Sequence, residues 1–267
     1  MGFRGLLVAG LVFTLGTTGC AQLLIGGITA AQALQPISDE QEVQIGNSAL
    51  LQMAQDPRFQ LYQGQALNQY VANVGVRLAQ ASSRPNLPWR FGVVVSDDLN
   101  AFALPGGIVC VTTGALKAMK NEAELATVLA HEIGHVAERH GIDQLKRAMV
   151  AQGLAIAALG TSPEIAQAAG AIAVQIVLNG YGREAEFEAD RFGIQLASKA
   201  GYNPEALVAF LETIAAHGGG TPGWLIPLSN HPSVQQRVQA IQQLIREKRL
   251  TGSKTNTEQF KRETAQL

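Results

Sequence analysis

The run His131-Glu132-Ile133-Gly134-His135 constrains the fold of this chain more than any other feature. On a helix, residues four positions apart share a face, so His131 and His135 can present both imidazoles to one divalent metal ion. Glu132 lies on the same side, where its carboxylate can reach a water molecule beside that ion. The run therefore predicts a helix with an HExxH motif that supplies ligands to a hydrolytic zinc site.

The residues around this run favour a helix with one buried face. Asn121 is typical of an N-cap, and Glu124 at the third helical position suits a capping box. Gly141 suits the end of the helix. The alternative, two histidines and a glutamate on a solvated helix face, is less consistent with the apolar stripe on the other side. That stripe consists of Leu125, Leu129, Ile133 and Val136.

A third ligand is needed, because a catalytic zinc ion usually takes three protein ligands and keeps one position for water. Three glutamates stand in one downstream acidic segment. On a helix, Glu186 lies on the opposite face from Glu184 and Glu188. Glu186 shares its face with Asp190 and Gly193, and small residues on that face allow two helices to approach closely. We therefore predict that Glu186 is the third metal ligand and that Glu184 and Glu188 belong to a solvated surface.

Asp190 follows Glu186 by one helical turn. Its carboxylate can accept the free ring N–H of a metal-binding histidine, which fixes the tautomer of that histidine and strengthens it as a ligand. The spacing does not indicate which of the two histidines Asp190 serves.

Four segments of the chain resemble the M48 family of zinc metallopeptidases, in its short periplasmic or lipoprotein form. They occur in the order typical of that family and lie within about residues 38 to 245. The last of them is followed by Arg237. The four segments are residues 100–107, 130–136, 181–191 and Asn230–Ser233.

The resemblance implies both a fold and a chemistry. The fold would be α+β and mainly α-helical: a zincin-like (gluzincin) metalloprotease domain with a small β-sheet beside the HExxH helix. One zinc ion (Zn2+) per chain would be bound by His131, His135 and Glu186. Glu132 would take a proton from the attacking water and later pass it to the leaving amine of a cleaved peptide bond.

Further site residues rest on the resemblance. His231 would donate a hydrogen bond to the oxyanion of the reaction, with Arg237 as support. The alternatives for His231 are a loop histidine that caps or packs, or one that occupies the open zinc position. An extended substrate would add to a sheet edge formed by residues 106–112. Asn100 and Gly107 are the predicted substrate-binding residues, although Asn100 can also start a turn.

Residues 1–33 are typical of an export leader, with an apolar run too short to cross a bilayer. Thr17-Thr18-Gly19-Cys20 resembles a lipoprotein box, which predicts cleavage before Cys20 and lipidation of that cysteine. Ala31-Gln32-Ala33 offers a second cleavage site near Leu34. Both alternatives place the protein in the bacterial periplasm or cell envelope, and the first one adds a membrane anchor.

The composition argues against a nucleic-acid partner and against a cysteine-based metal site. The formal net charge is −1, which gives no electrostatic reason to expect binding to nucleic acid. The two cysteines, Cys20 and Cys110, are too few for a disulfide framework or a cysteine zinc site. Apolar neighbours indicate that Cys110 is a buried and inert thiol.

The secondary structure is expected to be mostly helical over a peptidase domain at 38–248. Two valine-rich segments, 89–96 and 108–112, predict strands, with a turn at 105–107. The expected helices outside the two motif segments are 39–54, 65–81, one opened by Asn203 and Pro204, and 234–248.

Two further segments have distinctive compositions. Residues 148–178 are apolar, and a break at 160–164 divides them into two helices that are expected to form a buried hairpin. The alternative is a hydrophobic flap over the site or a segment that touches a membrane. Residues 251–267 are polar and lack periodicity, which predicts a disordered tail.

The predicted function is that of a zinc-dependent endopeptidase of the cell envelope, which cleaves unfolded or misfolded envelope proteins. Main-chain recognition at a sheet edge favours such substrates because they must be extended. One alternative is a zinc-containing chaperone or assembly factor, but Glu132 argues against it, since a pure binder needs no general base. The other alternative is a cell-wall amidase, and the four-segment resemblance argues against it.

Overall fold

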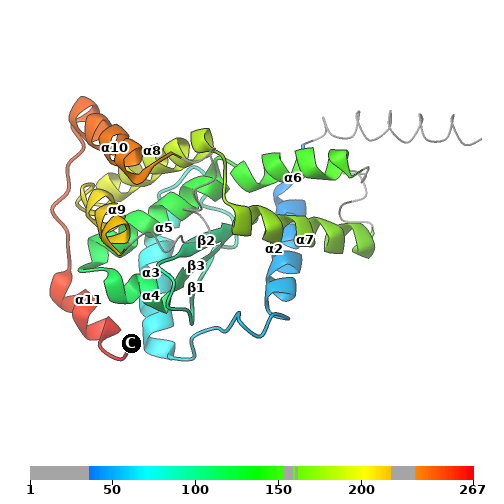
Figure 1. Ribbon diagram of the computed structural model, residues 1–267, viewed down its shortest axis with the longest axis horizontal. Helices are drawn as coiled ribbons and strands as arrows, with labels where there is room; N and C mark the ends of the chain where they lie inside the picture. The colour runs from blue at the N-terminus through cyan, green and yellow to red at the C-terminus, as the bar shows by residue number, and fades with distance from the viewer. Residues whose placement is uncertain (1–35, 153–158, 160–161, 218–231) are drawn as a thin grey trace, which may run out of the picture.

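The computed structural model describes residues 36–152, 159, 162–217 and 232–267 (Figure 1). The predictions about the leader at 1–33, about lipidation of Cys20 and about His231 therefore concern residues outside the described part of the chain.

A three-stranded sheet forms the centre of the molecule, in the order β1-β3-β2. Strand β1 (Arg90–Val94) runs parallel to β3 (Ile108–Thr112), and β2 (Ala101–Leu104) runs antiparallel to it. The valine-rich pattern correctly predicted β1 and β3, but β2 was missed because Ala-Phe-Ala-Leu contains no β-branched residue.

The turn between β2 and β3 depends on two glycines. Gly106 and Gly107 have φ angles of 76° and 97°, a region that side chains with a Cβ rarely adopt. The turn predicted at 105–107 is thus confirmed, and its tightness sets β2 and β3 side by side.

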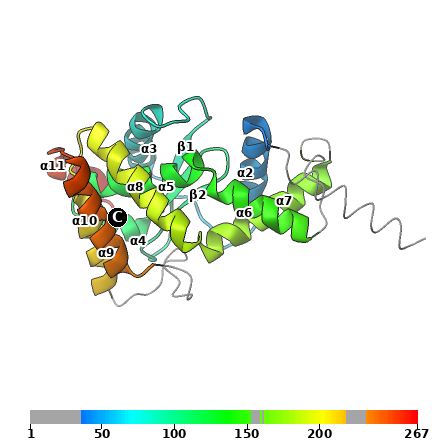
Figure 2. The same ribbon diagram turned by 90° about the horizontal axis from the view of Figure 1, so that it is seen from above.

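Helices surround the sheet (Figures 1 and 2). Several begin at the caps that their sequences suggest, including capping boxes at Ser38 and Ser233 and an asparagine cap at Asn121. The helices are α2 (Asp39–Met53), α3 (Gln65–Gln80), α4 (Thr113–Ala118), α5 (Glu122–Ala137), α6 (His140–Ala151), α7 (Pro163–Asn179), α8 (Arg183–Lys199), α9 (Ala206–Ala216), α10 (Val234–Lys248) and α11 (Thr257–Thr264).

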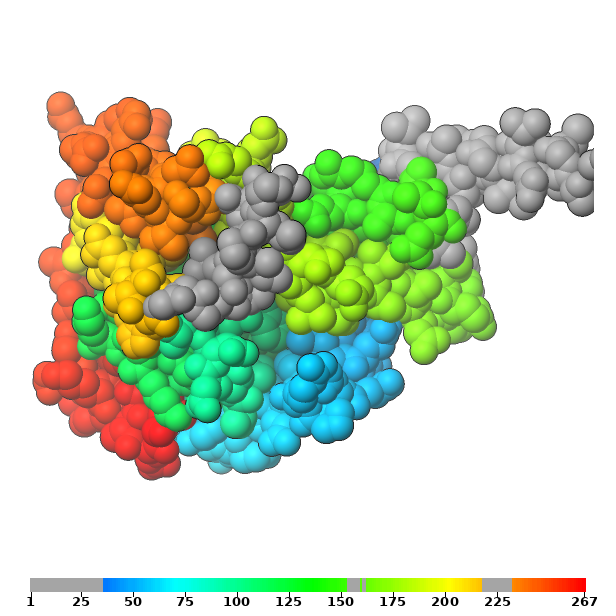
Figure 3. Space-filling view, in the orientation of Figure 1, coloured from blue at the N-terminus to red at the C-terminus, as the bar shows by residue number. Residues whose placement is uncertain are grey.

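The sheet separates two hydrophobic clusters, as the alternation of side chains along a strand requires. Val93, Val109 and Val111 belong to the cluster shared with α3, α5, α8 and α9. Ile108 and Cys110 belong to the cluster shared with α2, α6 and α7, which together form one side of the molecule (Figures 2 and 3). The fold is therefore α+β and mainly helical, as predicted, with the sheet beside α5.

The HExxH helix, α5, is buried on every side from Glu122 to Val136. It ends earlier than predicted, because Arg139 rather than Gly141 adopts the left-handed conformation, with φ of 59°. The chain turns there and α6 starts at His140. His140 thus begins a new helix instead of ending the HExxH helix, and this change brings it back towards the metal-binding motif.

The C-terminal segment corrects a second prediction. Residues 251–267 were expected to be a disordered tail, but α11 forms within them and buries Phe260 to 2% exposure. The ring of Phe260 lies 6.5 Å from that of Tyr70 in α3, and Asn256 donates a hydrogen bond to Glu122 at the start of α5 (2.7 Å). One buried aromatic ring and one amide are enough to order a segment that is otherwise polar.

The apolar segment at 148–178 contributes to two helices, as predicted. Ser162 caps α7 and Pro163 stands in its first turn, while α6 supplies the other arm and buries Met149. One face of α7 packs on α2 and α6, whereas Leu178 near its end is 49% exposed. Among the described residues no single helix is long and apolar enough to cross a bilayer; α7 and α8, bent by 82°, pass that test only as a pair.

Candidate metal centre

The metal centre is built where α5 and α8 cross at close range. A Cβ atom at Gly193 of α8 would lie 2.8 Å from the backbone nitrogen of His131. A Cβ atom at Gly134 of α5 would lie 3.2 Å from the Cβ of Phe192. Each helix therefore has a glycine where the other approaches, which confirms the prediction that small residues permit this packing.

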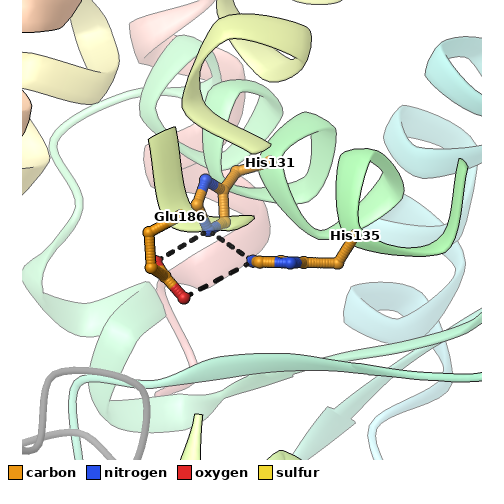
Figure 4. Close-up of side chains that lie close together, drawn as sticks. All are labelled: His131, His135 and Glu186. Atoms are coloured by element: carbon orange, nitrogen blue, oxygen red, sulfur yellow. Dashed lines mark hydrogen bonds and ion pairs between the residues drawn. The ribbon is translucent and has the colours of Figure 1, made fainter. Parts of the chain in front are cut away.

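Three side chains converge at this crossing (Figure 4). The Nε2 atoms of His131 and His135 lie 3.1 Å apart. The Oε2 atom of Glu186 is 3.7 Å from the Nε2 of His131, and its Oε1 atom is 3.7 Å from the Nε2 of His135. One ligand atom from each residue can thus surround a single position, and all three side chains are buried.

The three residues fit a zinc ion. Both carboxylate oxygens of Glu186 are buried and accept no hydrogen bond from the residues that the structure describes. The Arg237 guanidinium lies 3.3 Å from Oε2, but a buried carboxylate that accepts no hydrogen bond is costly. Burial raises the pKa of Glu186 to about 8 and lowers the pKa of both histidines, so the histidines are neutral and free to coordinate. Two histidines and one glutamate form a donor set typical of catalytic zinc.

The carboxylate of Asp190 contacts His131, whereas the sequence did not indicate which of the two histidines it would contact. The Nδ1 of His131 lies 3.0 Å from Oδ1 of Asp190. Burial alone would raise the pKa of Asp190, but the Arg237 guanidinium and the contact with His131 hold it at about 2. A permanently ionised carboxylate therefore faces the ring nitrogen of His131 that points away from the metal position.

Arg237 comes from α10 and joins two of the acidic residues. Its Nε and Nη2 atoms donate to the two oxygens of Asp190 at 2.8 and 2.6 Å, and its Nη1 lies 3.3 Å from Oε2 of Glu186. The side chain is 1% exposed. Arg237 was predicted only as a support for His231, and the structure shows in addition that it neutralises the carboxylates behind the metal position.

Glu132, the predicted general base, is 3% exposed and follows His131 in α5. Burial and the nearby charge of Glu186 raise the pKa of Glu132 to about 8. A carboxyl group with this pKa can hold a proton near neutral pH, which is a requirement for a group that takes up and returns a proton.

His135 has partners that the sequence did not reveal. Its ring stacks on Tyr181 with 4.1 Å between ring centroids, and its Nδ1 lies 2.9 Å from Nδ1 of His140. The Nε2 of His140 in turn lies 3.1 Å from Oε2 of Glu188. Glu188 was expected on a solvated surface; it is half-exposed, but one of its oxygens contacts this buried histidine. The proximity of His140 depends on the turn at Arg139, for which the sequence has no clear signal.

The expectation that residues 106–112 form an edge of the sheet is wrong. Strand β3 is the middle strand, so residues 106–112 have neighbours on both sides. The carbonyl of Gly107 accepts a hydrogen bond from the backbone N–H of Arg90 (2.8 Å), so this residue faces β1 and not a free edge. The strand next to the metal centre at the rim of the sheet is β2. Asn100, immediately before β2, has a buried Oδ1 atom with no hydrogen-bond partner among the described residues.

The metal-free protein should lose stability as the pH rises. Glu132 and Glu186 have folded-state pKa values of about 8, above their ordinary value of 4.5. Between these values the folded state binds more protons than the unfolded state, so the free energy of unfolding falls with increasing pH. Zinc requires the deprotonated ligands, so the rise in Tm on adding zinc should be larger at pH 8 than at pH 5. Thermal unfolding with and without zinc at both pH values measures this, and an equal rise at the two values would contradict it.

Comparisons with known proteins agree with this geometry. The model of peptidase family M48 matches residues 65–245. The chain is 32% identical to the beta-barrel assembly-enhancing protease of Escherichia coli strain K12 over 219 residues, which are 76% of this chain and 43% of that protein. It is 32% identical to the mitochondrial metalloendopeptidase OMA1 of Schizosaccharomyces pombe over 178 residues, 67% of this chain and 53% of that protein. It is 35% identical to the metalloprotease YcaL of Escherichia coli over 162 residues, 59% of this chain and 63% of that protein. The chain thus spans less than half of the first of these relatives.

Proposed function

The chain belongs to peptidase family M48, and from this membership and the metal centre we propose that it is a zinc-dependent endopeptidase. The observation that carries the proposal is the convergence of His131, His135 and Glu186 in one buried place, where neither Glu186 oxygen accepts a hydrogen bond from a described residue. A cation at this place balances the buried carboxylate and has the donor set of a hydrolytic zinc site.

Different residues have different roles in the proposed reaction. A bound zinc ion supplies a Lewis acid that polarises the scissile carbonyl and acidifies the attacking water. Glu132 accepts the proton of that water and later donates it to the leaving amine. Asp190 and Arg237 hold His131 and Glu186 in place while this occurs.

We propose that the substrate backbone pairs with the outer edge of β2. The backbone of Thr112 donates to the carbonyl of Asn100 (2.9 Å), so by the alternation of an antiparallel ladder Ala101 and Ala103 direct their backbone groups away from β3. The carbonyl of Ala103 accordingly accepts the hydroxyl of Tyr181 at 3.1 Å, and the Tyr181 ring stacks on His135. This edge therefore lies beside the metal ligands. The N–H and carbonyl of Ala101 point away from β3, but Ala101 is 1% exposed, so a substrate can pair with them only when this edge is uncovered.

Replacing Ala101 with proline tests this pairing. Proline removes the outward N–H without removing a hydrogen bond to β3. Because Ala101 is 1% exposed, the Tm of the variant is measured together with its activity. We expect kcat/KM for an extended peptide to fall about tenfold, the effect of one lost hydrogen bond. Ala101→Gly keeps the N–H and is the matched control. An unchanged kcat/KM in Ala101→Pro, with Tm also unchanged, would show that substrates do not pair here.

Recognition through main-chain hydrogen bonds favours substrates that are already extended. We therefore propose that the protein removes unfolded or misfolded proteins of the bacterial cell envelope, and the leader-like residues 1–33 support that location. Lipidation of Cys20 would attach it to a membrane. The mass of the mature protein distinguishes the two processing sites, since only cleavage before Cys20 leaves a lipid-modified N-terminus.

Two comparisons test the proposed activity. The zinc-loaded protein should cleave a casein-type unfolded substrate, lose this activity with a zinc chelator and regain it when zinc is restored. A tightly folded protein should be cleaved at least tenfold more slowly than its denatured form, because only the latter can extend along β2. Equal cleavage of the two forms would contradict selection of unfolded substrates, and a lack of cleavage with zinc bound would favour a non-proteolytic binding role.

A further inference from the structure

The two histidine ligands are held in different ways. His131 directs its Nδ1 towards the buried carboxylate of Asp190. His135 directs its Nδ1 towards a second histidine, His140, whose other ring nitrogen contacts Glu188. Among the described residues, the first arrangement ends at one carboxylate, whereas the second is a series of three side chains that runs from the metal centre to the surface.

The distances determine which ring nitrogens of His135 and His140 carry a proton. If Nε2 of His135 binds the metal, its Nδ1 carries the proton and must donate it. The acceptor at 2.9 Å is Nδ1 of His140, which must therefore be unprotonated. His140 then carries its proton on Nε2, where the carboxylate of Glu188 accepts it at 3.1 Å. Each donor meets an acceptor only in this one arrangement.

We infer that His140 and Glu188 form a hydrogen-bonded relay that fixes the tautomer and orientation of His135, and so act as positioning residues for the metal centre. The inference rests on the proposed function, because it assumes that Nε2 of His135 binds zinc. Asp190 orients His131, and in the same way His140 and Glu188 together orient His135.

The backbone around His140 is arranged for this contact. Arg139 adopts the left-handed conformation, which is unfavourable for a residue with a Cβ. It is held there by contacts of its guanidinium with Asp39 and with Glu42 in α2. This turn reverses the chain between α5 and α6 and places the ring of His140 5.0 Å from that of His135.

The outer end of the relay lies in a cleft of about 890 Å3 between α6 and the start of α8. His140 and Glu188 both line it, and the Glu188 side chain is 49% exposed. Glu184 lines the same cleft one helical turn earlier and is exposed. Since solvent screens Glu188, its loss should have a smaller effect than the loss of His140.

Zinc affinity in four variants tests the relay without reference to proteolysis. Competition with a chromophoric chelator gives the dissociation constant of Zn2+. His140→Leu should raise it about 10- to 100-fold, and Glu188→Ala towards the lower end of that range. His140→Asn places an amide oxygen where Nδ1 stood and should restore part of the affinity. Glu184→Ala removes the same charge from the same cleft and should leave the affinity unchanged.

The tautomers can be observed directly in the intact zinc-loaded protein. Its five histidines are few enough for assignment by nitrogen-15 NMR of the side chains. We expect His140 to be protonated on Nε2 alone, and Glu188→Ala to alter its nitrogen shifts. A proton on Nδ1 of His140 would overturn the relay.

The outcomes separate the relay from the proposed function. If the wild type binds one zinc ion but His140→Leu and Glu188→Ala bind it equally tightly, the relay alone is wrong. If the wild type binds no zinc, both are wrong. Should His140→Leu fail to fold, the zinc affinity of Glu188→Ala and the NMR spectrum of the wild type still test the relay. Glu188→Ala should fold, because Glu188 is half-exposed.

Discussion

Glu132→Gln is expected to abolish nearly all proteolysis while the protein still binds zinc. Glutamine has the same size as glutamate but cannot accept a proton from water, and a positioned general base contributes about 10²–10⁴-fold to the rate. Because Glu132 is not one of the three converging ligands, the zinc content should stay at one per chain. The measurement is kcat on a quenched-fluorescence peptide, together with metal analysis of the same sample.

Glu138→Gln is the matched control for this variant. Glu138 caps the same helix but is exposed, so its replacement should leave kcat unchanged. If Glu132→Gln keeps more than about a tenth of the wild-type kcat, a fall smaller than any general base of this kind would cause, Glu132 is not the base.

Arg237→Met is expected to cause the largest loss of stability. Arg237 is 1% exposed and contacts both Asp190 and Glu186, and its charge lowers the pKa of each carboxyl group. Removing one partner of a buried ion pair leaves an uncompensated charge and typically costs about 3–5 kcal/mol. Urea unfolding of the metal-free variant and wild type at pH 7 measures the difference.

Two companion variants make this result specific. Arg246→Met changes an exposed arginine of the same helix and should alter the free energy of unfolding by less than about 0.5 kcal/mol. Adding Asp190→Asn to Arg237→Met removes the ionised carboxylate that has lost its guanidinium and should recover part of the loss. A loss below about 1 kcal/mol in Arg237→Met would mean that water or another group already neutralises these carboxylates.

The parts of the site that follow helical periodicity could be predicted from the sequence. His131 and His135 are four residues apart, as are Glu186 and Asp190, so each pair lies on one face once its helix forms. The glycine at 193 also indicated which face of α8 meets α5. The structure brings these residues together as predicted, since the relation within each pair depends on local geometry and not on the path of the chain.

The remaining features depend on contacts between distant segments or on single backbone angles. The position of His140 follows from the φ of Arg139, and the order of α11 follows from one ring, Phe260, packing on α3. Strand β2 exists because β3 offers it a partner, although it contains two alanines and no β-branched residue. None of these leaves a periodic pattern, which is why the tail was predicted to be disordered and β2 was missed; the sheet edge at 106–112 had been placed by the family resemblance alone.

Anomalous diffraction at the zinc edge tests most directly whether His131, His135 and Glu186 bind one zinc ion. Crystals of protein loaded with one equivalent of Zn2+ should show a single peak between the Nε2 atoms of the two histidines and the carboxylate of Glu186. The peak should disappear in Glu186→Ala at the same zinc concentration. A zinc peak at other residues, or its persistence at full height in Glu186→Ala, would contradict this metal centre.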